Sequence, residues 1–305
     1  MTGGQVPPVT FFGDISHLCA WPRGSILNSM ESSPSRETVA VSQIPAFALD
    51  DIPTICAISA LACMLSTMLH EGLGHAAVAI ATLHASGTLT SLAWSSTQDS
   101  RLVAAGGTLV NLASALVFWL LLRASSSANP ALRFFFLITM SFNLLTGTGY
   151  FFYSGISNFG DWAQVIQGLQ AHWLWRVGLI VLGIVSYYGA ILVIGSSIVR
   201  YMGVALNDAR RFRRLTWLPY FSAIVIDGVA GLFNPFGMRY VFLSALAATA
   251  GGQSGLLWLR HYIPRRIQPG PDNQPIPRSY TWIVFSIVCA AIFIGVFGPG
   301  VHLGG

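Results

Sequence analysis

The sequence predicts an all-α, polytopic membrane protein of about six to seven transmembrane helices, with a short surface strand or hairpin after the first. Hydrophobic residues make up 53% of the chain and charged residues only 9%, whereas soluble domains carry about 25% charged residues. Mean hydropathy is +0.62. Apolar runs close to the roughly 20 residues that cross a bilayer as a helix divide the chain. This composition excludes an ordinary soluble domain.

The apolar runs that predict membrane helices cover residues 52–83, 102–122, 134–153, 177–199, 215–233, 240–259 and 282–296. The segment 234–237, Asn-Pro-Phe-Gly, is either a turn or a break within one helix, and this leaves the count at six or seven. Between the first two runs, apolar and polar residues alternate over residues 88–94. A period of two predicts a short strand or hairpin there.

The chain divides into three parts by composition. Residues 1–50 are mixed and polar, and we expect a poorly ordered N-terminal extension there. It lacks a basic segment followed by an apolar one, so we expect no cleavable signal peptide. Residues 51–200 form the expected membrane core. Residues 201–305 hold a basic loop, from Arg210 to Arg214, and additional transmembrane helices.

All the basic residues are arginines, and their placement predicts the topology of an integral, multi-pass membrane protein. With a cytoplasmic N-terminus and seven helices, the outside loops keep only Arg101, Arg176 and Arg239, and every other arginine falls inside. This arrangement satisfies the positive-inside rule. Because the arginines follow the topology, we expect contact with the lipid bilayer and no binding to nucleic acid.

The first apolar run contains two histidines and a carboxylate, His70-Glu71-Gly72-Leu73-Gly74-His75. Ionisable side chains within a membrane helix are costly, and they mark functional sites by default. The pattern is close to H-E-x-x-H, in which two histidines on one helix face bind zinc and the glutamate is a general base. Here one extra residue separates the histidines, as H-E-x-x-x-H.

The extra residue changes the helical geometry. Positions i and i+4 lie about 40° apart around a regular helix, whereas positions i and i+5 lie about 140° apart. A π-type bulge absorbs one residue and returns His75 to the face of His70, and such bulges are frequent at functional sites. Gly72 and Gly74 lower the steric barrier to this distortion, and Gly72 is the expected insertion. His84 is a substitute ligand if His75 points away.

The stretch Leu73-Gly74-His75-Ala76 after His70-Glu71 resembles the H-E-L-G-H-A motif of the site-2 protease family of intramembrane zinc metalloproteases, with one glycine inserted. The longer spacing is also similar to the variant motif of the soluble dipeptidyl-peptidase III family, whose two histidines both bind zinc. That second resemblance covers the motif alone. The first resemblance extends over residues 55–200.

Two further stretches carry the first resemblance. Residues 104–112 are similar to the small-residue and asparagine signature of the family's next core helix, with Asn111 at the asparagine. Asn158-Phe159-Gly160-Asp161-Trp162 resembles a reduced form of the N-P-x-x-x-x-D-G region, whose aspartate is the third zinc ligand. The prolines are missing, and tryptophan replaces the final glycine. Asp227, followed by Gly228 within the fifth run, is the alternative third ligand.

The resemblance implies a zinc metalloendopeptidase that cleaves membrane-anchored protein substrates. It implies Zn²⁺ held by His70, His75 and Asp161, with Glu71 as general base on a zinc-bound water and Asn111 donating to the substrate. Two other functions stay open. One is a catalytically inactive relative that binds membrane segments or acts as a scaffold. The other is an ion or proton-coupled transporter using His70, Glu71, Asp161 and Asp227.

Overall fold

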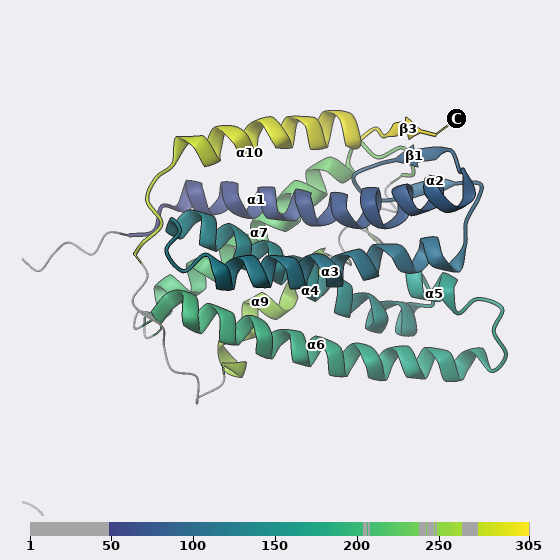
Figure 1. Cartoon of the computed structure of the whole chain (residues 1–305), viewed down its shortest axis with the longest axis horizontal. Helices are drawn as coiled ribbons and strands as arrows, with labels where there is room; N and C mark the ends of the chain where they lie inside the picture. Colours follow the sequence, from purple (N-terminus) through teal and green to yellow (C-terminus); the bar gives the residue numbers. More distant parts are fainter. Residues whose placement is uncertain are drawn as a thin grey trace, which may run out of the picture. The chain divides into compact units, whose positions relative to one another are not determined.

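A computed structural model of the protein describes residues 49–203, 206, 208–237, 242, 247, 249–263 and 274–304. The described part is mostly helical, and its long helices run side by side along one direction (Figure 1). The expected polar extension, residues 1–50, lies outside the described residues except for Leu49 and Asp50.

Among the described residues, five helical segments are long and apolar enough to cross a membrane. The first is continuous from Ile52 to Leu83 and consists of α1 (Ile52–Met68), the π-helix η1 (Leu69–Ala76) and α2 (Ala77–Leu83). The others are α3 (Arg101–Ala124), α4 (Pro130–Ser157), α6 (His172–Met202), and α10 (Tyr280–Ile292) continued by the π-helix η6 (Phe293–Phe297). These helices confirm the prediction of an apolar, membrane-type helical protein.

The predicted fifth and sixth helices have a different character. The fifth corresponds to α7 (Ala209–Gly231), which starts in the arginine cluster and contains Pro219. The sixth, predicted over residues 240–259, lies partly outside the described residues. Its described part is broken into η4 (Gly252–Ser254), α9 (Gly255–Trp258) and η5 (Leu259–Tyr262), two of which are 3₁₀ turns. Glycines at 251, 252 and 255 disfavour a regular helix there.

Helix α4 lies at the centre of the bundle, where it packs against α1, α3 and α6, while α1 also packs against α7 and α10. The interior holds large apolar side chains such as Phe134, Phe142 and Tyr201. The exterior is apolar as well, with Val185 on α6 and Ile287 on α10 each more than 60% exposed. Apolar surface on both the inside and the outside is unfavourable in water and is typical of a bundle surrounded by lipid.

Polar side chains define where the helices begin. Asp51 accepts hydrogen bonds from the backbone N and the Oγ1 of Thr54 at the start of α1. Ser100, Asn129 and Asp208 cap α3, α4 and α7 in the same way. Each cap satisfies backbone N–H groups that have no partner in the first helical turn. The starts of α4 and α7 and the ends of α3 and α6 lie at one end of the bundle (Figure 1).

A small antiparallel sheet lies at the opposite end of the bundle, next to α2 and α5 (Asp161–Val165) (Figure 1). Strand β1 (Gly87–Leu89) pairs with β2 (Trp94–Ser96), with Leu89 opposite Trp94. These strands form the hairpin that the alternating pattern predicts. A third strand, β3 (Val301–Leu303), pairs with the other edge of β1, giving the order β2-β1-β3. The sequence analysis did not predict β3, because its partner lies more than 200 residues away.

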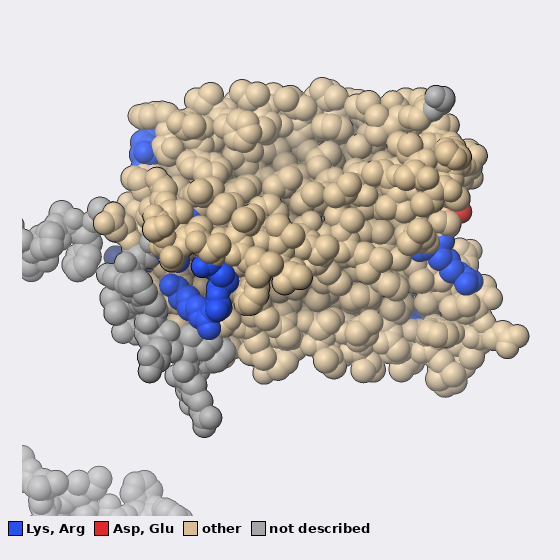
Figure 2. All heavy atoms as spheres, in the orientation of Figure 1, with Lys and Arg blue, Asp and Glu red and all other residues tan. Residues whose placement is uncertain are grey.

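Basic side chains gather near the ends of the helices. On the face drawn in Figure 2, arginines lie at the two ends and the band between them is almost free of charge. Arg123, Arg133, Arg200 and the cluster from Arg210 to Arg214 belong to the end where α4 and α7 begin. Arg101 and Arg176 belong to the sheet end. More arginines thus lie at the end where α4 and α7 begin than at the sheet end, and this is the end that the positive-inside rule assigns to the cytoplasm.

Candidate metal centre

The six-residue motif lies on a π-helix, as the spacing of the histidines predicts. Element η1 covers Leu69–Ala76, and the backbone N–H of Ala77 donates to the carbonyl of Gly72, five residues earlier. The wider turn returns His75 to the face of His70. The Nε2 atoms of the two histidines are 3.2 Å apart, and both residues are buried, with 4% and 8% exposure.

Glycines bring η1 into direct contact with α3. A Cβ added to Gly74 would lie 2.5 Å from the Cα of Gly107, and one added to Gly106 would lie 2.0 Å from the carbonyl oxygen of Gly74. Neither position can hold a larger residue unless the two helices separate. Gly72 has no such contact, since its added Cβ would meet a Leu89 side-chain carbon at 3.7 Å. Gly74, rather than the inserted glycine, therefore sets the packing distance.

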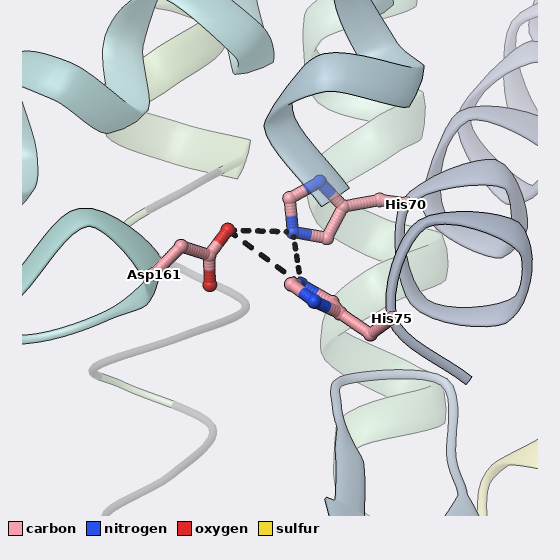
Figure 3. A group of neighbouring side chains, drawn as sticks. All are labelled: His70, His75 and Asp161. Carbon is pink, nitrogen blue, oxygen red and sulfur yellow. Dashed lines mark hydrogen bonds and ion pairs between the residues drawn. The ribbon is translucent and has the colours of Figure 1, made fainter. Parts of the chain in front are cut away.

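Asp161 completes the group from a different part of the chain. It is the first residue of α5, and it follows a turn in which Asn158 and Gly160 both have positive φ. Its Oδ2 lies 3.2 Å from the Nε2 of His70 and 3.6 Å from the Nε2 of His75. Figure 3 shows the carboxylate pointing at the two imidazoles from the opposite side. Asp227, the alternative third ligand, is not part of this group.

The second nitrogen of each histidine is held by α3. The Nδ1 of His70 lies 3.0 Å from the Oδ1 of Asn111, and the Nδ1 of His75 lies 2.7 Å from the carbonyl oxygen of Val103. Both partners only accept, so each Nδ1 carries a proton, and each Nε2 is left facing Asp161, where it offers a lone pair to a metal once it is deprotonated. Tyr150 stacks on His70, with ring centroids 4.9 Å apart. Metal-binding histidines usually have such outer partners.

The spacing of the three facing atoms fits a small tetrahedral ion. With bonds of about 2.0–2.1 Å, as for zinc, tetrahedral ligand atoms lie about 3.3 Å apart. The three distances in the group are 3.2, 3.2 and 3.6 Å. A Cβ added to Gly107 would lie within 2.6 Å of both Nε2 atoms, so the glycine keeps the space beside them open. The Oδ2 of Asp161 is buried and has no hydrogen-bond donor among the described residues.

The charge state of Asp161 suits a ligand. Burial alone would raise the pKa of its carboxyl group, but the neighbouring His75 and His70 lower that pKa below its ordinary value. The carboxylate therefore stays ionised at neutral pH and offers an anionic oxygen to a cation.

Glu71 lies beside the group, at the wall of a large cavity. Its Oε2 accepts from the backbone N of Trp94 on β2 at 2.9 Å, and its Oε1 lies 3.9 Å from the Nε2 of His70. A cavity of about 1210 Å³ is lined by Glu71, His75 and Asp161, by the β2 hairpin, and by aromatic residues of α4 and α6. The carboxylate of Glu71 is thus held by the sheet at the wall of a space large enough for a peptide segment.

Two further candidate residues lie outside the group of three. Asn111 is fully buried and does not line the large cavity, and its Oδ1 lies beside the Nδ1 of His70, so the contact that the structure gives it is with this histidine. From its position on α3, the side chain of Asn111 contacts the imidazole of His70, which lies between it and the Asp161 carboxylate. His84, the substitute ligand, is exposed at the end of α2 and is not part of the group. No side-chain pattern in the sequence reveals the backbone partners of the group, the carbonyl of Val103 and the N–H of Trp94.

Fold and site together define a class: an apolar helical bundle with a buried two-histidine, one-carboxylate group beside a glutamate and a large cavity. No family model, curated protein or solved structure matches the chain.

Proposed function

We propose that this protein is a membrane-embedded zinc metalloendopeptidase, similar to the site-2 proteases, that hydrolyses peptide bonds of membrane-anchored substrates. The convergence of His70 Nε2, His75 Nε2 and Asp161 Oδ2 carries the proposal. His70 and Asp161 are 91 positions apart in the sequence. The three atoms nevertheless have the spacing of three ligands in a tetrahedral zinc site. His70, His75 and Asp161 would hold the Zn²⁺.

Bound zinc supplies two effects in hydrolysis: it lowers the pKa of water, and it polarises a carbonyl group. The chain's own residues move the protons. Glu71 accepts a proton from water at Oε1, because Oε2 is occupied by the N–H of Trp94. The water oxygen bonds to the carbonyl carbon, the C–N bond breaks, and Glu71 returns the proton to the leaving amine.

The large cavity supports a peptide as substrate. It extends from Glu71 along the β2 hairpin and between α4 and α6, and its lining includes Tyr150, Tyr187 and Trp258. A wall of aromatic and backbone groups suits an apolar segment whose helix has been unwound. An extended segment needs hydrogen-bond partners inside a membrane, and the polar groups on the cavity wall, such as those of the β2 hairpin, provide them.

The proposal includes seven helices and a cytoplasmic N-terminus. The long helices alternate in direction from α1 to α7, and α1, α4, α7 and α10 all begin at the arginine-rich end, as expected if the partly described sixth segment runs back between α7 and α10. On this orientation the candidate centre lies in the half of the bundle nearer the non-cytoplasmic side, with the sheet and α5.

Cleavage in the bilayer tests the proposal. The wild type and the Glu71→Gln variant are reconstituted in liposomes with single-span peptides that carry an Asn-Gly break at mid-span. The reaction runs in water labelled with ¹⁸O, and the products are identified by mass spectrometry. We expect the wild type to place ¹⁸O in a new carboxylate. Glu71→Gln should keep its zinc and form no product.

The same measurements separate the alternatives. An inactive relative would bind the peptides without cleaving them, and Glu71→Gln would change nothing. A transporter would move ions across empty liposomes, with a dependence on Asp227 as strong as that on Glu71. Product formation that persists in Glu71→Gln would contradict the proposed role of this residue.

A further inference from the structure

A second, smaller cavity lies behind the candidate metal centre. Its volume is about 50 Å³, and its lining includes the polar residues Ser66, Thr67, Ser91, Asp227, Thr249 and Gln253. It shares Glu71, Leu92, Thr146 and Tyr150 with the large cavity. Glu71 is thus one of four residues at the boundary of the two spaces; His75 and Asp161 line the large one, and His70 and Asp227 line the small one.

Two buried acceptors in this cavity lack a donor among the residues that the structure describes. Asp227 is 4% exposed; its Oδ2 accepts from the Oγ1 of Thr249 at 2.5 Å and from the Sγ of Cys63 at 3.4 Å. Its Oδ1 has no partner among the described residues. Gln253, also 4% exposed, donates through Nε2 to the Oγ1 of Thr146 and to the carbonyl oxygen of Phe142, while its Oε1 has no donor in the described part of the chain.

We propose that the small cavity is a water-binding site, in which ordered waters donate to Asp227 Oδ1 and Gln253 Oε1 and extend to Glu71. Buried polar groups without protein partners are normally satisfied by such waters. A buried water needs about 10–15 Å³ of cavity volume. The cavity of about 50 Å³ therefore has room for roughly three waters. The walls supply the two to four polar partners that each of these waters needs.

The site gives Asp227 a role that rests on the proposed function. Hydrolysis consumes one water for each bond that is cut. Waters held by Asp227 reach the large cavity by passing Glu71, which lines both spaces. Asp227 is a positioning residue for water and touches neither the substrate nor the metal.

Radiolytic footprinting tests for the water without using activity. X-ray pulses create hydroxyl radicals from water in place, so buried side chains beside bound water are oxidised. Cys63 lines the cavity and is 5% exposed, whereas Met64 is 4% exposed and does not line it. With each rate divided by that of the same residue in the unfolded chain, we expect Cys63 to be oxidised several-fold faster than Met64 in the full-length protein in nanodiscs. In Asp227→Leu, the rate for Cys63 should fall to that of Met64.

Ser66→Val provides a second variant, because it removes a polar wall group and leaves Asp227 and its partners in place. It should also slow the oxidation of Cys63. Equal rates for Cys63 and Met64 in the wild type would overturn the proposal. So would a metal ion, beyond the one expected at the histidines, that disappears in Asp227→Leu. If Cys63 is labelled but the protein binds no zinc, the water site stands and the proposed protease function fails.

The supply role has its own readout. Asp227→Leu should slow peptide cleavage several-fold at unchanged zinc content, and Asp227→Asn, which keeps a polar group at the cavity, should restore both cleavage and the oxidation of Cys63. Normal cleavage in an Asp227→Leu variant that has lost the oxidation of Cys63 would contradict the supply role.

Discussion

The Nδ1 of His70 donates to the Oδ1 of Asn111 across 3.0 Å, and this bond ties the π-helix to α3 at the candidate metal centre. It fixes the tautomer of His70 and the direction of its free Nε2. Loss of such an outer partner typically lowers metal affinity about 10–100-fold.

We therefore predict that Asn111→Leu weakens zinc binding within that range, because His70 loses the acceptor that orients it. Competition with a fluorescent chelator measures the affinity. Asn143→Leu is the matched control: Asn143 is also fully buried, but its Nδ2 donates to Thr139 of its own helix. Equal loss of affinity in both variants would mean that general destabilisation, and not orientation, explains the effect.

The contact between η1 and α3 predicts a difference between two glycines of the motif. Gly74→Ala places a methyl group 2.5 Å from the Cα of Gly107, whereas the nearest atom to a methyl group at Gly72 is 3.7 Å away. Overpacking of this kind costs about 1–3 kcal/mol. Thermal unfolding should show a lowered Tm for Gly74→Ala and little change for Gly72→Ala. Chelator competition should likewise show weakened zinc binding for Gly74→Ala alone. A larger effect at Gly72 would show that the insertion itself sets the packing.

The third ligand can be tested by comparing the two candidate aspartates. Asp161→Ala removes the carboxylate next to both histidines and should abolish stoichiometric zinc binding at micromolar concentration. Asp227→Asn should retain the metal, because Asp227 bonds to Thr249 and Cys63 instead. Asp99→Ala controls for the loss of a surface carboxylate near the large cavity. Zinc retained in Asp161→Ala and lost in Asp227→Asn would reverse the assignment.

A buried ion pair fixes the start of the first helix. The Nε of Arg211 donates to the Oδ2 of Asp50 at 2.9 Å, and Asp50 also accepts from the backbone N of Ile276. Loss of one partner of a buried pair costs about 3–5 kcal/mol. We predict this loss for Arg211→Met in unfolding by denaturing detergent.

Arg213→Met supplies the control for that measurement. Arg213 is two residues along the same helix and is exposed, so its substitution should change stability by less than about 0.5 kcal/mol. If Arg211→Met is as mild as Arg213→Met, the pair does not stabilise the junction of α1 and α7.

The sequence predicted those features that depend on neighbouring residues. The spacing of His70 and His75 predicted the π-helix, and the alternation over residues 88–94 predicted the hairpin. Asp161 was placed by resemblance and by its position one helix after Asn111. The bond between Asn111 and His70, the pairing of β3 with β1, and the cavity around Asp227 depend on contacts between distant segments. Periodicity and spacing carry no information about such contacts.

The metal content of the purified protein tests the central claim most directly. We predict about one zinc per chain by elemental analysis of protein purified in nanodiscs, with loss of the metal in His70→Ala and in His75→Ala. His84→Ala, which removes an exposed histidine at the end of the same segment, should retain it. Protein that binds no zinc even after incubation with the metal, or that keeps its zinc without His70 and His75, would contradict the account.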